Sequence, residues 1–374
     1  MKNIILLIFS IIISQSIFSQ CNGRYDSEIF SSVTKTTVNY SDVYVNSQHT
    51  MNIYTPDGDT ETNRPLILFM HGGSFYGGDK TEPDCVDFCE SFAKRGYVTA
   101  SVNYRLVGLL DVVSFLTYNS EQYEEVLKAT SDVKSAIRYF RKDFSNGNTY
   151  GIDTSTIFVG GSSAGAIIAI HLAYIDDITD LPTMAVDNNG SVINVQSIAN
   201  NLGGLEGDAG NDGYSSKVSG VISFAGGIND VNWIDSFDEP LVSVQGNTDL
   251  TVNYNCGPGL NNPNVLTLCG SGEMHPQANS VGLINDVLVY PGEGHTWFIS
   301  GNSNSKFTQA LEFTKDFLYP LLPCNNTTSV ESFNDEKQLI KITDILGREV
   351  NEKQNTPLFY LYDDGTIEKK IIIE

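Results

Sequence analysis

Residues 156–170 read TIFVGGSSAGAIIAI, two apolar runs joined by a short segment of glycine, serine and alanine. The first run, with β-branched and aromatic side chains, is typical of a buried strand, and the second suits a buried helix. The joining segment is a G-x-S-x-G pentapeptide centred on Ser163. Its glycines, Gly161 and Gly165, permit a sharp turn and keep other side chains away from the serine hydroxyl. Strand, turn and helix in this order predict a nucleophile elbow.

A second glycine motif, His71-Gly72-Gly73, follows another apolar strand predicted at residues 65–70. Glycines at the end of a strand can turn backbone N–H groups toward a developing negative charge. We therefore expect Gly72 or Gly73, together with Ala164 after the candidate nucleophile, to form an oxyanion hole. Two such motifs in one chain make chance a poor explanation for either.

A serine hydroxyl is a weak nucleophile and needs an adjacent base. The chain has five histidines. Four are better explained by structural roles: His49 in an early hairpin, His71 in the glycine loop, His171 on the helix after the elbow, and His275 before a proline at a predicted helix start. His295 lies on a glycine-rich loop after a strand predicted at 286–290, and we predict that it is the base.

The base needs a third group that orients it, expected on a loop after a core strand between the serine and the histidine. Residues 240–246 form that strand, and Asp249 follows it as the predicted acid. Asp230 and Asp235, after the preceding strand, are the alternative acids. The order serine, aspartate, histidine is that of α/β-hydrolases and differs from both serine-protease orders.

Strand and helix signals alternate around these motifs. Strands are expected at 65–70, 97–103, 218–224, 240–246 and 286–290, helices at 84–95, 121–143 and 305–319, and antiparallel strands within 33–55. Such repeats predict a mostly parallel central sheet flanked by helices. Together with the order of the three candidate residues, this predicts an α/β-hydrolase fold. Residues 175–217, rich in Asn, Gly and Asp, are too long for an ordinary connection and predict a functional lid or a flexible insert.

The start of the chain predicts export. Lys2, the apolar run 4–13 and a small polar exit indicate a signal peptide over residues 1–20. The catalytic domain then spans 21–324, with no transmembrane segment expected in the mature protein. Cys21 leaves a lipoprotein alternative open, although the residues before it match a lipobox poorly.

Six cysteines are an even number, which favours disulfides in an exported chain. Cys256 and Cys269 are the pair we expect, because they bracket a loop rich in Gly, Pro and Asn. Cys85 and Cys89 have helical i,i+4 spacing, but no histidine or second thiol pair lies near them in sequence. No metal site or other cofactor is predicted.

The composition changes after Cys324. Residues 325–329 (NNTTS) are typical of a linker, and short strands are expected at 339–342, 358–362 and 369–373, with an Asp-Asp-Gly turn at 363–365. Together they predict a small all-β appendage over 325–374. The net charge of −23 and the pI near 4.4 disfavour binding to nucleic acid or to anionic membrane surfaces.

Several of these motifs together resemble secreted Bacteroidetes carboxylesterases, similar to the feruloyl and acetyl-xylan esterase branch of the α/β-hydrolases. The residues that carry the resemblance are HGGSFYGGDK at 71–80, VNYRL at 102–106, the GSSAG elbow, GNTD at 246–249 and Gly294-His295. The resemblance covers residues 22–322 and implies a cofactor-free esterase that forms an acyl-enzyme. Ala166 departs from the pattern, because many relatives carry a glycine there.

The tail carries a second resemblance. DILGREV at 344–350 and the residues from Tyr362 to Glu374 are similar to a type IX secretion C-terminal sorting domain. This resemblance implies that the type IX secretion machinery is a partner and that the protein is exported across the outer membrane to the surface or the medium.

The acyl group is the least determined part of the prediction. Export suggests acetyl or feruloyl-type esters on polysaccharides, or related small and aryl esters. The aromatic residues Phe75, Tyr76, Trp233 and Trp297 lie near the motifs and are the candidate substrate contacts, unless they simply pack. The alternatives are a serine exopeptidase of the prolyl-oligopeptidase type, a lipase or polyester hydrolase, and a non-enzymatic adhesion protein.

Overall fold

The computed structural model describes residues 21, 23–324, 339–344, 348, 350, 358–362 and 367–370. The predicted signal peptide, the linker at 325–329 and the turn at 363–365 lie outside these residues. The described residues form two units: a large unit that ends at Cys324 and a C-terminal unit within 339–370.

The large unit is built on an eight-stranded sheet in the order β1-β2-β4-β3-β5-β8-β9-β12. The strands are β1 (Val33–Asn39), β2 (Thr50–Pro56), β3 (Arg64–Met70), β4 (Val98–Val102), β5 (Ile152–Ser162), β8 (Gly220–Phe224), β9 (Leu241–Gly246) and β12 (Asn285–Tyr290). β2 pairs antiparallel with β1 and with β4, and every pair from β4 to β12 is parallel. The predicted mostly parallel α/β architecture is confirmed.

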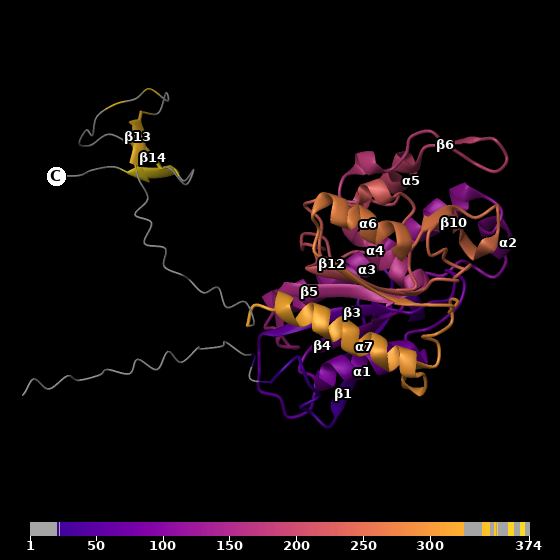
Figure 1. Ribbon diagram of the computed structural model, residues 1–374, viewed down its shortest axis with the longest axis horizontal. Coiled ribbons are helices and arrows are strands. Elements are labelled where there is room, and N and C mark those ends of the chain that lie inside the picture. Colours follow the sequence, from indigo (N-terminus) through magenta and orange to yellow (C-terminus); the bar gives the residue numbers. More distant parts are fainter. Residues whose placement is uncertain are drawn as a thin grey trace, which may run out of the picture. The chain divides into compact units, whose positions relative to one another are not determined.

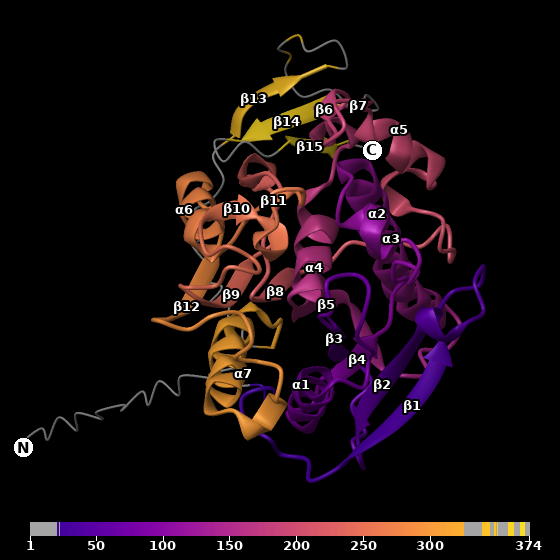
Figure 2. The same ribbon diagram turned by 90° about the vertical axis from the view of Figure 1, so that its right-hand side faces the viewer.

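Helices cover both faces of this sheet (Figure 1). One face carries α3 (Asn119–Ser145), preceded by the short α2 (Val112–Phe115), together with α4 (Ala164–Tyr174) and α6 (Ser271–Val281). The other face carries α1 (Pro83–Lys94) and α7 (Ser305–Leu318), and Figure 2 shows the same two layers after a quarter turn. Each face buries its own cluster of apolar side chains, so the sheet is covered by hydrophobic cores on both sides.

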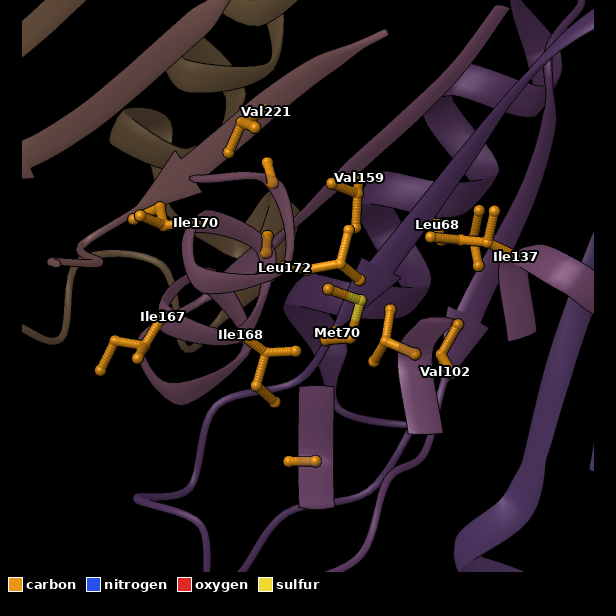
Figure 3. Close-up of a cluster of buried hydrophobic side chains, with 14 of the residues drawn as sticks. Leu68, Met70, Val102, Ile137, Val159, Ile167, Ile168, Ile170, Leu172 and Val221 are labelled. Atoms are coloured by element: carbon orange, nitrogen blue, oxygen red, sulfur yellow. The ribbon is translucent and has the colours of Figure 1, made fainter. Parts of the chain in front are cut away.

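Helix α4 is apolar around its whole circumference, and every one of its residues is buried. Figure 3 shows Ile168 and Leu172 of α4 beside Met70 of β3, with Val159 of β5 next to them. A helix buried on all sides cannot turn or slide without losing apolar contacts. The N-terminus of α4, where the elbow lies, is therefore held firmly at the end of β5.

The segment 175–217 is folded and not an unstructured insert. It contains a hairpin of β6 (Ala185–Val186) and β7 (Val192–Ile193), followed by α5 (Val195–Asn201). A small apolar cluster of its own holds it together, made of Ile175, Leu181, Ile193, Val195 and Ala199.

A charged network ties the glycine-rich end of this segment to the sheet. Arg105, which follows β4, donates to Asp208 over 2.6 Å and to Asp132 of α3 over 2.9 Å. His49 Nε2 lies 3.2 Å from the same Asp132 carboxylate. On α3, the Arg138 guanidinium also donates to the carbonyl of Gly210. These bonds explain how a segment so rich in glycine and aspartate stays ordered.

Two disulfides are present among the described cysteines. The expected bond Cys256–Cys269 is confirmed, and it joins β10 (Cys256–Pro258) to β11 (Thr267–Cys269). A second bond, Cys21–Cys324, closes the ends of the large unit over 303 residues of sequence and was not predicted. The lipoprotein alternative would instead place a lipid thioether on the same Cys21 sulfur, and it stays a prediction from sequence.

Cys85 and Cys89 lie on α1 as free, buried thiols. Among the described residues, no group of three or more potential ligands is arranged to hold a metal ion. The described helices also include none with the length and apolar character needed to cross a membrane.

The C-terminal unit is an antiparallel three-stranded sheet of β13 (Leu339–Thr343), β14 (Leu358–Tyr362) and β15 (Ile367–Lys370). The predicted all-β appendage is confirmed. The third strand was predicted at 369–373 but begins at Ile367, because its pairing with β14 starts opposite Leu361.

Candidate active site

Ser163 occupies the junction of β5 and α4 with φ 53° and ψ −115°. A positive φ is rare for a residue with a side chain and stores backbone strain. The turn is held on both sides, because the Ser163 N–H donates to Phe224 O over 2.8 Å and the Ser163 carbonyl accepts from Ile167 N over 2.9 Å. The structure therefore places the predicted serine on a strained elbow.

The two glycines of the elbow are required by close backbone contacts. A Cβ at Gly161 would lie 2.4 Å from the carbonyl carbon of Gly165, and a Cβ at Gly165 would lie 2.2 Å from Met70 O. Neither backbone atom can move aside as a flexible side chain could. Strand β3 can approach the elbow only because both positions lack a side chain.

Ala166, the departure from the family pattern, is accommodated by a neighbouring glycine. A Cβ at Gly226, after β8, would lie 2.5 Å from the Cβ of Ala166. The methyl group therefore fills space that Gly226 leaves free, and α4 packs against the sheet without a glycine at 166.

The structure brings Ser163, Asp249 and His295 together. His295 Nε2 lies 2.8 Å from Ser163 Oγ, and His295 Nδ1 lies 2.7 Å from Asp249 Oδ2. The other oxygen, Asp249 Oδ1, accepts from the backbone N–H groups of Thr251 and Val252 at 2.8 and 3.0 Å. The carboxylate is buried and held by these bonds, so it can fix the orientation of the imidazole.

The three residues meet because each follows a parallel strand. Ser163 follows β5, Asp249 follows β9 and His295 follows β12, and the carboxyl ends of parallel strands lie at one edge of the sheet. The alternative acids do not join this group. Asp230 and Asp235 accept from backbone N–H groups two residues further along, in local turns.

The other four histidines contact neighbours that account for them. His71 Nδ1 lies 2.6 Å from Gly72 O, and its ring stacks on Tyr104. His171 Nδ1 lies 2.7 Å from Ile167 O, and burial lowers its pKa to about 4, so the ring is neutral. His49 lies beside Asp132, as described above. His275 was placed at a helix start, which is wrong: it lies inside α6, 2.7 Å from Asn285 Oδ1.

The predicted oxyanion donors lie around Ser163. A Cβ at Gly72 would come within 3.3 Å of Ser163 Cβ, so the glycine loop passes directly over the serine. Gly73 has φ 117°, and its carbonyl accepts from Gly77 N over 2.9 Å, which closes the loop into a tight turn. Ala164 is the first residue of α4, where backbone N–H groups have no partner within the helix.

Two cavities open beside Ser163. The first, which we call the apolar pocket, has a volume of about 90 Å³. Its walls include Phe75, Phe115, Ile167, Leu181, Trp233 and Leu268. The second, the polar cleft, has a volume of about 260 Å³ and is lined by Gly72, Gly73, Glu82, Asp84, His295 and Phe298, among others.

The four predicted substrate contacts divide evenly. Phe75 and Trp233 line the apolar pocket, and Trp233 is fixed by a bond from its indole N–H to Asp180 O. Trp297 is a wrong prediction: it is 3% exposed and packs in the core against Phe224 and Tyr290. Tyr76 is 41% exposed and lines neither cavity.

Most residues that line the apolar pocket were not predicted from the sequence. Val126 and Leu127 come from α3, and Ile175 and Leu181 come from the segment after α4. The helical periodicity of α3 showed that one face is buried, but nothing in it distinguishes side chains that line a cavity from side chains that pack in a core.

The sheet, the elbow and the site geometry define an α/β-hydrolase. The chain belongs to the BD-FAE family, whose model matches residues 51–262, more than half of the sequence. The match includes Ser163 and Asp249 and ends before His295.

The chain is also similar to parts of larger proteins. It is 32% identical over 126 residues to the para-nitrobenzyl esterase of Bacillus subtilis, which is 33% of this chain and 24% of that protein. It is 31% identical over 125 residues to the neuroligin-like protein glit-1 of Caenorhabditis elegans, 33% of this chain and 15% of that protein. The chain thus spans a quarter or less of these relatives.

Solved structures share the fold at low sequence identity. The apo form of Thermogutta terrifontis esterase 2 aligns with a TM-score of 0.52 and 19% identity, covering 76% of this chain and 93% of that one. A truncated carbohydrate esterase from gut microbiota aligns with a TM-score of 0.50 and 17% identity, covering 78% of this chain and 97% of that one.

Proposed function

We propose that this protein is a serine carboxylesterase that hydrolyses acetyl or feruloyl-type esters of polysaccharides, or related small and aryl esters. The observation that carries the proposal is the unbroken chain of short contacts from Ser163 Oγ through His295 to the buried Asp249 carboxylate. Membership of an esterase-type family and the esterase names of its relatives support the reaction class.

The reaction follows from this arrangement. His295 takes the Ser163 proton while the serine oxygen bonds to the ester carbonyl carbon, and Asp249 stabilises the imidazolium that forms. The N–H groups of Ala164 and of Gly72 or Gly73 bind the oxyanion. The bond between the carbonyl carbon and the alcohol oxygen then breaks, and the departing alcohol oxygen takes the proton from His295. Water attacks the acyl-enzyme by the same steps and releases the acid and the free serine.

The two cavities suggest where each half of the ester lies. The departing alcohol must receive its proton from His295, and His295 lines the polar cleft but not the apolar pocket. We therefore place the alcohol in the polar cleft and the acyl group in the apolar pocket. The more polar cleft suits a sugar alcohol, and the aromatic walls of the pocket suit a short or aromatic acyl group.

Export to the cell surface or the medium through the type IX machinery is part of the proposal. The Cys21–Cys324 and Cys256–Cys269 disulfides support it, because such bonds persist in oxidising compartments. The signal peptide and the tail motifs remain predictions from sequence.

The test compares Ser163→Ala with Ser162→Ala, which removes a buried hydroxyl one residue away. We expect Ser163→Ala to lower the kcat for p-nitrophenyl acetate on the order of 10⁴-fold or more, as for other lost nucleophiles. Ser162→Ala should keep activity within about tenfold, since a neutral hydroxyl is worth only about 1 kcal/mol. Near-normal turnover by folded Ser163→Ala would overturn the proposal.

The substrate class is tested by measuring the activity of the purified protein on a panel of substrates: methyl ferulate, acetylated xylan, p-nitrophenyl esters and aminoacyl-p-nitroanilides. Hydrolysis of the esters without the anilides supports the esterase. Preference for the anilides would favour the exopeptidase alternative.

A further inference from the structure

A third cavity lies directly behind the apolar pocket, and we call it the inner cavity. It has a volume of about 20 Å³ and is lined by residues of α3, by the end of α4 and by the segment that follows. Four residues line both the apolar pocket and the inner cavity: Val126, Leu127, His171 and Ile175. These four side chains form the partition between the two.

The four members of the partition are held to different degrees. His171 is fixed at both ring nitrogens, by Ile167 O on one side and by the Asn229 N–H, 3.3 Å away, on the other. Val126 is β-branched on a helix, where one χ1 rotamer dominates. Leu127 and Ile175 belong to the small apolar cluster of the 175–217 segment or pack against it. Of the four, they have the largest aliphatic side chains, so shortening them removes the most material from the partition.

The far side of the partition has both apolar and polar walls, and the polar side chains Lys134 and Thr130 each have a protein partner. Lys134 Nζ donates to Leu205 O over 2.7 Å, and Thr130 Oγ1 donates to Val126 O over 2.8 Å. Leu202 and Leu205 supply the remaining surface. Groups that are already paired compete little for a ligand, so the space suits the end of an alkyl chain.

We infer that Leu127 and Ile175 are specificity-determining residues that set the upper limit on acyl length. The native pocket ends at these two side chains, so it accepts acyl groups that stop at the partition and excludes unbranched chains that would reach past it. Shortening either side chain joins the pocket to the inner cavity and admits longer chains. This inference rests on the proposed function, because it places the acyl group in the apolar pocket.

The test is Leu127→Ala against a matched control, Leu268→Ala. Both leucines are half-buried and line the apolar pocket, but Leu268 does not line the inner cavity. We expect Leu127→Ala to raise the ratio of kcat/KM for p-nitrophenyl octanoate over p-nitrophenyl acetate about tenfold or more, the scale of a few methylene contacts. Leu268→Ala should widen the pocket without lengthening it and change the ratio less than about threefold.

If circular dichroism shows that Leu127→Ala does not fold, Ile175→Val provides a second variant that opens the partition. This substitution removes only one methyl group and should preserve the fold. It should shift the same ratio in the same direction by a smaller factor. Leu127→Phe should shift the ratio the other way.

The outcomes separate the two proposals. Absence of ester hydrolysis by the native protein overturns the proposed function. Native hydrolysis of acetate esters with the same octanoate ratio in Leu127→Ala, Ile175→Val and Leu268→Ala overturns the inference and leaves the esterase intact. An octanoate preference already present in the native protein also overturns it.

Discussion

Ser163 holds a strained conformation that a free serine would not adopt, at a cost of about 1–3 kcal/mol. The strain persists because α4 is buried on all sides and the elbow backbone is bonded to Phe224 and Ile167. The result is a hydroxyl placed 2.8 Å from Nε2 of His295, its candidate base. Pre-positioning of this kind removes part of the entropic barrier to reaction.

Asp84 gives a second residue-scale consequence. It is buried at the start of α1, beside the polar cleft. Burial raises the pKa of this carboxyl from 3.8 to about 6. Between these values the folded protein keeps a proton that the unfolded chain has released, so stability falls as the pH rises through about 4 to 6.

We therefore predict that Asp84→Asn raises the free energy of unfolding at pH 8 by up to about 3 kcal/mol, since each unit of pKa shift is worth about 1.4 kcal/mol. At pH 4, where the native carboxyl is mostly protonated, the gain should nearly vanish. Urea unfolding of the variant and the native protein at both pH values measures this difference in the free energy of unfolding. Equal effects at pH 4 and pH 8 would contradict the prediction.

At the scale of elements, the active site depends on how closely β3 and the elbow approach each other. That approach exists because Gly161 and Gly165 leave room for the Met70 carbonyl. The same edge of the sheet gathers the loops after β5, β9 and β12, which carry the three candidate catalytic side chains. The segment 175–217 adds Ile175 and Leu181 to the wall of the apolar pocket, so the insert shapes this pocket.

We expect Gly165→Ala to lower the melting temperature strongly, with a loss of stability of at least about 2 kcal/mol, because the new methyl group would overlap the Met70 backbone. Gly294→Ala is the matched control, since a Cβ there meets nothing within 4 Å and its φ is not positive. Differential scanning calorimetry of both variants checks this. A Gly165→Ala protein as stable as Gly294→Ala would show that β3 can shift away.

At the scale of the whole molecule, the Cys21–Cys324 disulfide closes the large unit into a loop just before the C-terminal segment begins. Closing so long a loop restricts the unfolded chain and is expected to stabilise the fold by about 2–5 kcal/mol. It also means that removal of the tail after Cys324 leaves the large unit fully cross-linked.

Two truncations that differ by one residue test this role. A protein ending at Cys324 should keep the esterase activity and the melting temperature of the full chain. A protein ending at Pro323 loses the disulfide and should lose about 2–5 kcal/mol of stability, measured by guanidinium unfolding under oxidising conditions. Equal stability of the two truncations would show that the bond contributes nothing.

Local sequence patterns were enough to predict the elbow at Ser163, the alternation of strands and helices, and the short-range disulfide Cys256–Cys269. Each depends on residues close together in the chain: glycines that a turn requires, apolar periodicity, and cysteines that bracket one loop. Asp249 and His295 could be chosen because parallel strands bring their carboxyl ends to one edge, so chain order already limits which loops can meet.

Local sequence patterns could not predict how distant segments pack against each other. Trp297 looks from its neighbours like a substrate contact, yet it packs in the core behind the site. The disulfide joins Cys21 to Cys324, and the partition brings Leu127 of α3 together with Ile175 after α4. No local pattern encodes the proximity of either pair. Apolar side chains that line a cavity and those that fill a core obey the same hydrophobic preference, and only the three-dimensional packing distinguishes them.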